Sequence, residues 1–310
     1  MPIQQMFLRS YGGGGGPRGI WGGGQPSTAV IDFVTISTLG NAATFGSLIS
    51  SRRWLAGCSN GTRGLFGGGY NTNQIQYITC ATEGNGTDFG DLTVNRYALG
   101  ACGNATRGLF AADDSGGADG ESIDYVTIAN TGDASNFGNL TQGRYNVQGC
   151  ASASRGLFVG GYGPNTPTYA YNIIDYVTIA STGNATDYGD LEQNKNNVGC
   201  VDNDTRACFG GGSWQPGPAA LTNVIGYVTI ATTGNTTDFG DLTIARKVGA
   251  GTNDKTVGVD RGCFGGGFDN TSWINTIDYI TISNTGNAQD FGDLTQGRAN
   301  VAGVSGGDAA

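Results

Sequence analysis

The chain alternates short apolar runs with turns rich in glycine and asparagine, and one phrase of this alternation returns along its whole length. The phrase is RGLFGGG at residues 63–69, and altered copies begin at residues 18, 107, 155, 206 and 261. Each copy is followed by a second phrase of the type IDYVTIASTGNATDFGDL. A repeat of roughly 40–50 residues that contains several short β-type segments is typical of propeller folds.

The pattern predicts four strands in each repeat. The first is a small-residue segment such as YALGACG, and the second is the RGLFGGG phrase. The third is IDYVTI, as at residues 123–128, 174–179 and 277–282, which is apolar on both faces, as a strand between two neighbouring sheets must be. The fourth carries Phe-Gly-Asp-Leu and is predicted to end at a basic residue, as from Phe89 to Arg96.

The two ends of the repeat region complement each other. The copy at Arg18 lacks a preceding first strand, whereas after Arg298 the chain reads ANVAGVSGG, which matches a first strand. Pairing of these ends would close the ring and remove its exposed edges. We therefore predict an all-β fold: a tail and glycine-rich hinge at 1–17, then a single six-bladed propeller at 18–310 with four-stranded antiparallel blades, blade one being closed by the C-terminal strand.

Composition narrows the classes of partner. The net charge is −9 and only 13% of residues are charged, so the surface must consist mostly of neutral hydrogen-bonding groups. An acidic chain disfavours nucleic acid and anionic membrane surfaces, and no apolar stretch approaches the ~20 residues of a membrane-spanning helix. The first residues show no basic region followed by an apolar run, so we expect no secretory signal peptide.

Cysteine is the first candidate for site chemistry, because the chain has seven cysteines and no histidine. Cysteines at repeated apolar positions are interpreted as small core residues. Cys200 and Cys208 flank one turn and are the only pair that we consider for a disulfide. One repeat position is assigned to Cys58, Cys102, Cys150 and Cys200, and Cys208 and Cys263 replace the leucine of the RGLF phrase.

The repeated acidic pairs, such as Asp88 and Asp91, are the second candidate. Calcium requires six to eight oxygen ligands, and the pairs are not present in every repeat. We interpret these side chains as bonding turn amides or pairing with the repeated arginine. No facing carboxylate pair of the glycosidase type is recognisable. The sequence therefore predicts no catalytic residue, no metal site and no cofactor.

Taken together, the four segments resemble the kelch repeat: a small-residue strand, an aromatic strand ending in Gly-Gly, a β-rich strand, and an aromatic strand running to an arginine. The resemblance covers roughly residues 18–310. It departs from the usual kelch pattern in replacing Trp by the residues Phe89, Phe137, Tyr188, Phe239 and Phe291. The near-identical copies rich in Asn, Thr and Gly also resemble propeller repeats of virion and tail-associated proteins of tailed phages, especially marine ones.

The connections between second and third strands differ most in length, being short at 70–74 and long at 114–122, 162–173, 213–224 and 268–276. Variation on one face of a rigid scaffold is where binding usually occurs. Aromatic side chains near acids and amides suit sugar rings, although the alternative is that they cover the backbone of their own loops. The candidate ligand-binding residues are Tyr162, Tyr169, Tyr171, Trp214, Trp273, Asp113 and Asp114.

The resemblance implies a non-enzymatic structural and recognition protein of a virus particle, assembled in the host cytoplasm and located in the virion. As a tail or capsid appendage it would bind a host-surface glycan or protein. The N-terminal segment would attach it to other virion proteins through Ile3, Met6, Phe7 and Leu8. Two alternatives stay open: a cytoplasmic kelch-type protein-interaction module and a glycan-processing propeller enzyme.

Overall fold

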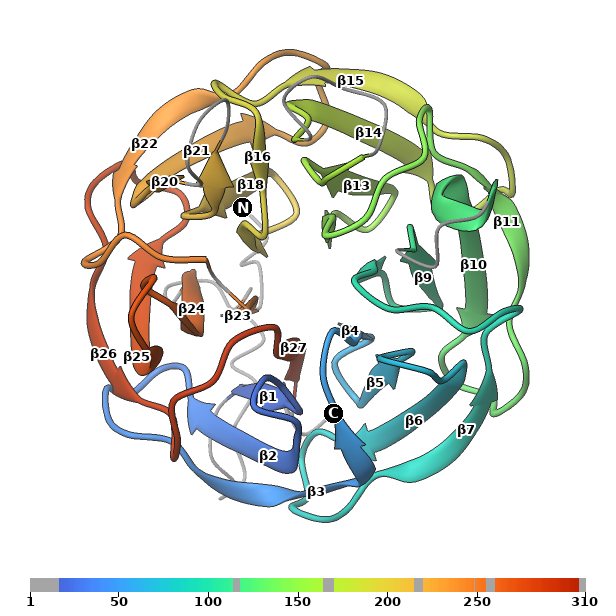
Figure 1. Cartoon of the computed structure of the whole chain (residues 1–310), viewed down its shortest axis with the longest axis horizontal. Coiled ribbons are helices and arrows are strands. Elements are labelled where there is room, and N and C mark those ends of the chain that lie inside the picture. The colour runs from blue at the N-terminus through green and yellow to red at the C-terminus, as the bar shows by residue number, and fades with distance from the viewer. Residues whose placement is uncertain are drawn as a thin grey trace, which may run out of the picture.

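The computed structural model describes residues 17–113, 118–163, 170–214, 220–247, 249–254 and 260–306. This part of the chain contains 27 β-strands and one short 3-10 helix, Ala118–Glu121. The strands form six four-stranded sheets and one small three-stranded sheet, all antiparallel, within the described residues. Figure 1 shows the four-stranded sheets arranged around a central axis. The predicted all-β class is confirmed, and the arrangement is propeller-like.

We number the four-stranded sheets 1 to 6 along the chain and give their strands from the axis outwards. Sheet 1 consists of β27 (Ala302–Gly306), β1 (Arg18–Gly22), β2 (Thr28–Thr35) and β3 (Ala43–Arg52). Sheet 2 consists of β4 (Ala56–Ser59), β5 (Arg63–Gly67), β6 (Gln74–Thr79) and β7 (Thr87–Asp91). Sheet 3 consists of β8 (Gly100–Gly103), β9 (Arg107–Ala111), β10 (Ser122–Thr127) and β11 (Ser135–Asn139).

Sheets 4 to 6 follow the same plan, and the small sheet lies at the loops of sheet 5. Sheet 4 consists of β12 (Gln148–Ala151), β13 (Arg155–Val159), β14 (Ile173–Thr178) and β15 (Thr186–Asp190). Sheet 5 consists of β17 (Gly199–Asp202), β18 (Arg206–Gly210), β21 (Val224–Thr229) and β22 (Thr237–Asp241). Sheet 6 consists of β23 (Ala250–Asp254), β24 (Arg261–Phe268), β25 (Trp273–Thr281) and β26 (Gln289–Asp293). The small sheet consists of β16 (Lys195–Asn196), β19 (Ser213–Trp214) and β20 (Ala220–Leu221).

The two ends of the repeat region meet in sheet 1. Strand β27 pairs antiparallel with β1, with register from Arg18 opposite Gly306 to Gly22 opposite Ala302. The innermost strands also contact one another in cyclic order: β27 with β4, β4 with β8, β8 with β12, β12 with β17, β17 with β23, and β23 with β27. The expected pairing of the C-terminal strand with the first copy is therefore present.

The arginine that opens each RGLF phrase links its sheet to the next. Each guanidinium donates to a carbonyl at the end of the third strand of the following sheet, and five of the six lie over the tyrosine of their own third strand. The donors and acceptors are Arg18 to Cys80, Arg63 to Ile128, Arg107 to Ile179, Arg155 to Ile230, Arg206 to Ile282 and Arg261 to Ile36. The last of these joins sheet 6 to sheet 1.

The aromatic residue of the same phrase packs against a glycine of the preceding sheet. A Cβ atom added to Gly67 would lie 2.6 Å from the ring of Phe110, and one added to Gly265 would lie 2.7 Å from the indole of Trp21. A larger residue at these glycines would push neighbouring sheets apart, because protein interiors hold few voids that could absorb it. Sheet-on-sheet packing thus favours glycine at these two positions, whereas Ala111 and Val159 occupy the same position in sheets 3 and 4.

Four buried arginine–aspartate pairs form a second set of links between sheets. In each, the arginine follows the outermost strand of one sheet and the aspartate lies on the third strand of the next. The pairs are Arg96–Asp124 (2.9 Å), Arg144–Asp175 (3.0 Å), Arg246–Asp278 (3.1 Å) and Arg298–Asp32 (2.9 Å). A threonine three residues before each arginine donates its hydroxyl to the same aspartate. The repeated arginine therefore pairs with an acid of the next repeat, not with the Asp-x-Gly-Asp turn.

The junction between sheets 4 and 5 satisfies the same needs with different residues. Glycine replaces the aspartate at Gly226, and glutamate replaces the threonine at Glu192. The Glu192 carboxylate forms an ion pair with the buried Lys195 ammonium and accepts from Thr236 Oγ1 at 2.9 Å. A Cβ atom on Gly226 would lie 2.9 Å from Glu192 Oε2, so the carboxylate fills the space beside the glycine. The junction therefore keeps a carboxylate beside the basic residue, but sheet 4 supplies it through Glu192 and the third strand of sheet 5 does not.

Three details differ from the sequence-based expectation. The fourth strand of sheets 2 to 6 ends at the Asp or Asn before the apolar residue, so the basic residue lies in the following connection. The predicted loop at 268–276 is largely a hairpin, because Phe268 pairs with Trp273. Cys200 does not share the position of Cys58, because Val201 opposes Cys208 as Cys58 opposes Leu65.

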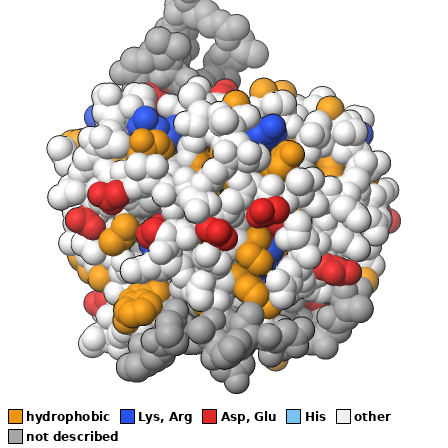
Figure 2. Space-filling view, turned by 90° about the horizontal axis from the view of Figure 1, so that it is seen from above, with side chains coloured by type: hydrophobic (Ala, Val, Ile, Leu, Met, Phe, Trp, Pro, Cys, Tyr) orange, Lys and Arg blue, Asp and Glu red, His pale blue; other side chains and the backbone are white. Residues whose placement is uncertain are grey.

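The surface matches the composition. Figure 2 shows a side view of the molecule in which neutral polar groups and backbone predominate over scattered acidic and few basic side chains. Among the residues that the structure describes, no helix has the length and apolar character needed to cross a bilayer. Of the predicted tail at 1–17, only Pro17 belongs to the described residues, so the residues Ile3, Met6, Phe7 and Leu8 lie outside them.

Candidate functional site

The strand connections divide between two faces of the ring. We call one the loop face: it carries the connections from second to third strands and from fourth to first strands, such as 68–73 and 92–99 in sheet 2. We call the other the turn face: it carries the remaining connections, such as 60–62 and 80–86. Each connection from a third to a fourth strand spans the same interval, as at 80–86, 128–134 and 282–288, whereas those between second and third strands differ widely.

Three of the predicted ligand-binding residues are aromatic side chains spread over sheets 4, 5 and 6 of the loop face. Tyr162 packs on Tyr145 with ring centroids 5.2 Å apart, Trp214 pairs with Lys195 in the small sheet, and Trp273 is 44% exposed beside Phe268. No ring contact joins Tyr162, Trp214 and Trp273 within the described part of the chain. They form separate features and not one pocket.

The other four predicted residues present less to a ligand or cannot be placed. Asp113 is buried and accepts from the backbone N–H of Tyr97 at 3.2 Å. Tyr171 is buried, and its hydroxyl accepts from Gln142 Nε2 at 2.7 Å. Asp114 and Tyr169 lie outside the described residues. A ligand-binding role for these side chains remains a prediction.

A cluster that the sequence reasoning missed lies between sheets 1 and 2 on the loop face, and we call it the Arg53 cluster: Arg53, Trp54, Tyr70 and Tyr97. The Arg53 guanidinium lies 4.5 Å from the ring centre of Trp54 and 4.7 Å from that of Tyr70. The three rings contact one another, with centroids 5.5–5.8 Å apart. Tyr70 is 48% exposed, and the other three residues are partly exposed.

A departure from the repeat could have revealed this cluster. Arg53 occupies the position of Tyr97 and Tyr145 in the following repeats, and Trp54 occupies that of Ala98 and Asn146. The backbone at Trp54 has φ of 58°, a left-handed conformation that asparagine tolerates and a bulky residue rarely adopts. Trp54 therefore occupies a position where the backbone conformation does not favour a bulky side chain.

Hydrogen bonds between successive connections hold this part of the loop face together. The amide of Ala98 donates to the carbonyl of Trp54 at 3.0 Å, and the amide of Asn146 donates to Ala98 at 2.6 Å. Asn197 donates in turn to Asn146 at 3.4 Å. Four successive connections are thereby tied to one another, and the backbone of Trp54 in the Arg53 cluster belongs to this series.

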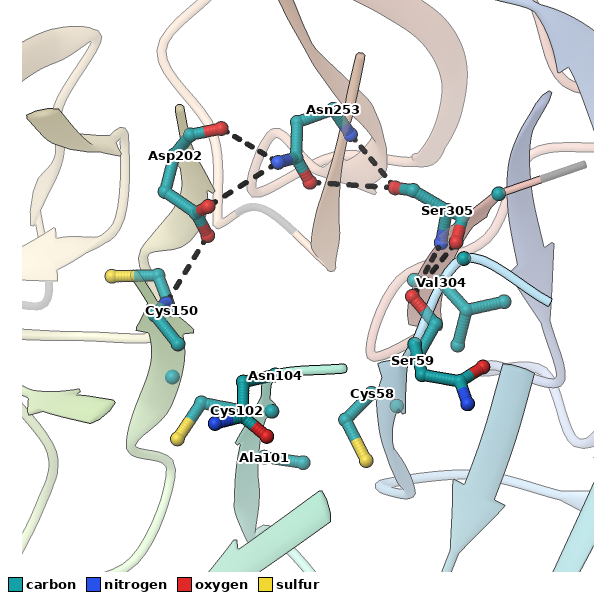
Figure 3. A pocket seen from close by; sticks show the side chains of 18 of the residues that line it. Cys58, Ser59, Ala101, Cys102, Asn104, Cys150, Asp202, Asn253, Val304 and Ser305 are labelled. Carbon is teal, nitrogen blue, oxygen red and sulfur yellow. Dashed lines mark hydrogen bonds between the residues drawn. The ribbon is translucent and has the colours of Figure 1, made fainter. Parts of the chain in front are cut away.

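A cavity of about 490 Å³ opens on the axis at the turn face. Figure 3 shows a chain of hydrogen bonds along one side of it. Asn253 Nδ2 donates to the backbone carbonyl of Asp202 at 2.6 Å, and the backbone N–H of Asn253 donates to Ser305 Oγ at 2.8 Å. Ser59 Oγ donates to the backbone carbonyl of Ser305 at 2.8 Å. The other side is lined by Cys58 and other thiols. These bonds connect sheets 5, 6, 1 and 2.

The thiols of the axis are packing groups. Burial raises the pKa of Cys58 to about 12 and raises that of Cys102 well above its usual range. A hydrogen bond to Cys200, together with burial, also raises the pKa of Cys150. All seven cysteines are free, which answers the question of a Cys200–Cys208 bridge. Thiols of raised pKa stay protonated near neutral pH and are poor nucleophiles.

These thiols predict a loss of stability in alkali. Their folded-state pKa values lie above the unfolded value of about 8.5, so their contribution is complete below that pH and declines as the pH rises towards 12. Between the two pKa values a thiol is protonated in the folded state and ionised in the unfolded state. For each such thiol the free energy of unfolding falls by about 1.4 kcal/mol per pH unit. Urea unfolding between pH 8 and 11 measures the slope, which should be smaller in a variant with Cys58→Ala and Cys102→Ala. An equal slope in both proteins would contradict the assignment.

Within the described residues, no group of three or more His, Cys, Asp or Glu side chains is placed to hold a metal ion. The described features with recognition character are therefore the Arg53 cluster, the aromatic residues of sheets 4 to 6, and the axial cavity. No protein-family model matches this chain, and a search of curated proteins finds no significant match.

Proposed function

We propose that the six four-stranded sheets are the blades of a closed, six-bladed, kelch-like β-propeller that serves as a non-enzymatic recognition protein of a virus particle. As a tail or capsid appendage, it contacts a host-surface glycan or protein through its loop face. The N-terminal segment with Ile3, Met6, Phe7 and Leu8 attaches it to other virion proteins.

The observation that carries this proposal is the placement of partly exposed aromatic side chains on the loop face, at the gaps between sheets. Tyr70 and Trp273 are the most exposed, at 48% and 44%. Aromatic residues supply large contact area at low entropic cost and are frequent in binding hot spots. Buried ion pairs join sheet 2 to sheet 3, sheet 3 to sheet 4, sheet 5 to sheet 6 and sheet 6 to sheet 1. Beneath Tyr70, Arg52 joins sheet 1 to sheet 2 by donating to the carbonyls of Gly68 and Gln74, so the aromatic groups are held at fixed spacing.

The surface chemistry agrees with this role. A chain with 13% charged residues offers mainly amides and hydroxyls to a partner, which suit the hydroxyl groups of glycans. The near-identical repeats and their resemblance to virion propellers support the proposed location in a virus particle. The two alternatives use the same face for other purposes. A cytoplasmic interaction module would bind a protein partner there, and a glycan-processing enzyme would cleave its ligand there.

The test uses particles purified on a density gradient from cells that express the chain. Quantitative mass spectrometry should find it at a fixed number of copies per particle, and deletion of residues 1–16 should abolish incorporation while the propeller still folds. Recovery only in the soluble fraction with one cytoplasmic partner would overturn the virion role. Turnover of a polysaccharide, abolished by a single Asp→Asn change, would establish the enzyme instead.

The loop face is tested by competition. Excess purified chain should reduce attachment of particles to host cells, and the double variant Trp273→Ser with Tyr162→Ser should compete less well. A variant of the turn face, Asn60→Ser, serves as the control, because its side chain only caps a local turn through the amides of Thr62 and Arg63. Equal competition by all three proteins would contradict recognition through the loop face.

A further inference from the structure

We propose that the Arg53 cluster binds an acidic sugar unit, with Arg53 holding its carboxylate or sulfate group and an aromatic ring stacking on its flat face. This inference rests on the proposed function, since it names the ligand class that the loop face recognises. It assigns a site to a region that the sequence pattern did not single out.

The first argument is the state of the Arg53 charge. Its guanidinium lies over two aromatic rings, at 4.5 Å and 4.7 Å, and makes no salt bridge or side-chain hydrogen bond with any residue that the structure describes. Every other arginine that opens or closes a repeat donates to a carbonyl or carboxylate of a neighbouring sheet, as Arg63 and Arg144 do. Arg53 thus keeps its N–H donors for a group from outside.

The second argument is preorganisation. A guanidinium stacked on ring faces keeps its edge free, and its planar donors match the geometry of carboxylate and sulfate oxygens. The rings fix the plane of the group before the ligand arrives, so little rotamer entropy is lost on binding. In a chain of net charge −9, a cation held in this way attracts anions that the rest of the surface repels.

The third argument concerns the shape of the surface. The axial cavity of the turn face and a second, smaller cavity on the axis include no residue of the Arg53 cluster, and Tyr70 is 48% exposed. An exposed aromatic platform fits the apolar face of a sugar ring, whereas an acidic peptide gains most of its affinity when a side chain fills a pocket. The combination of platform and fixed cation therefore favours an acidic glycan over an acidic peptide.

The chain provides substitutions that preserve the fold. Trp54→Asn installs the residue found at the same left-handed position in Asn146, Asn197 and Asn300, so it removes the ring without straining the backbone. Arg53→Gln removes the charge and keeps a polar stem. Lys247→Gln is the matched control, because it removes one charge from the same face beside Phe268.

Isothermal titration calorimetry is carried out with hexagalacturonate and a heparin hexasaccharide, and with the methyl-esterified and desulfated forms as neutral counterparts. We expect at least one acidic form to bind about tenfold or more tightly than its neutral counterpart. Arg53→Gln should lose about tenfold or more in affinity, Trp54→Asn should also weaken binding, and Lys247→Gln should leave it unchanged. Melting temperatures within a few degrees of the parent show that the variants are folded.

Three outcomes would overturn the inference: no binding of either acidic probe, equal binding by Arg53→Gln, or loss in Lys247→Gln alone. Equal affinity for a hexaglutamate peptide would replace the sugar by an acidic peptide. The two levels of proposal separate cleanly. Particle attachment that survives Arg53→Gln overturns only this site, whereas acidic-sugar binding by a chain that is absent from particles overturns only the virion role.

Discussion

Truncation of the chain after Val301 is expected to abolish folding. The change removes β27, which supplies the innermost strand of sheet 1 and contacts β4 and β23 of its neighbours. Burial of the Val304 side chain contributes about 1.5–3 kcal/mol, and each ladder hydrogen bond to β1 contributes about 1 kcal/mol. Their sum approaches the 5–15 kcal/mol that stabilises an ordinary domain.

Circular dichroism and urea unfolding measure the effect, and a chain that ends at Gly306 is the control because it retains the whole of β27. The truncated chain should show no cooperative transition, whereas the control should unfold like the parent. Supplying residues 299–306 as a separate peptide should restore part of the transition. A truncated chain with undiminished cooperativity would mean that sheet 1 is stable as a three-stranded sheet.

The substitution Asp175→Ala is expected to lower the free energy of unfolding by about 3–5 kcal/mol, which is the cost of leaving one member of a buried ion pair without its partner. Arg144 and Asp175 are both fully buried, and Thr141 donates a backbone and a hydroxyl hydrogen bond to the same carboxylate. Burial lowers the pKa of Arg144 and Asp175 opposes that shift, so removal of the aspartate leaves the burial cost uncompensated.

The junction between sheets 4 and 5 supplies a rescue for this variant. Transferring its residues, as Asp175→Gly with Thr141→Glu and Arg144→Lys, places the acid on the other sheet in the manner of Glu192, Lys195 and Gly226. The triple variant should recover at least half of the loss caused by Asp175→Ala, as measured by urea unfolding. A loss below about 1 kcal/mol in Asp175→Ala, or no recovery in the triple variant, would contradict the role assigned to these pairs.

Repetition explains how much of the fold could be predicted. The RGLF strand and the IDYVTI strand recur often enough along the chain to be recognised as the second and third strands of each repeat. The absence of a first strand before Arg18, with its counterpart after Arg298, predicted the pairing that β27 and β1 make. These features could be predicted because the strands and turns are encoded by the local sequence of each repeat.

Partners in different repeats could not be predicted in the same way. Nothing in the spacing shows that Arg144 meets Asp175 across a sheet boundary, because the contact depends on how twisted sheets pack. The assignment of Cys200 failed for a simpler reason. Cys58, Cys102 and Cys150 each lie five residues before the arginine of the next RGLF phrase, but Cys200 lies six residues before Arg206. The register accordingly places Val201 opposite Cys208. A shift of one residue in a strand moves a side chain to the opposite face, and Cys200 accordingly lines both axial cavities.

The candidate site was predicted as one face of the molecule with seven residues on it. Loop length identified the loop face, but Asp113 and Tyr171 are buried there. The residues of the Arg53 cluster come from connections of two repeats. Tyr70 lies in the short connection at 70–74, so a search for long loops did not find it. The substitution of Arg and Trp at positions 53 and 54 for the residues of other repeats was the available signal.

Hydrogen exchange with mass spectrometry tests the closure of the ring most directly. The peptides that cover residues 18–22 and 302–306 should be protected to the same degree as those that cover the inner strands of sheet 4, residues 148–151 and 155–159, because β27 pairs with β1 as β12 pairs with β13. Rapid exchange at 302–306, with residues 18–22 exchanging as an open edge, would contradict the pairing of the chain ends and with it the ring.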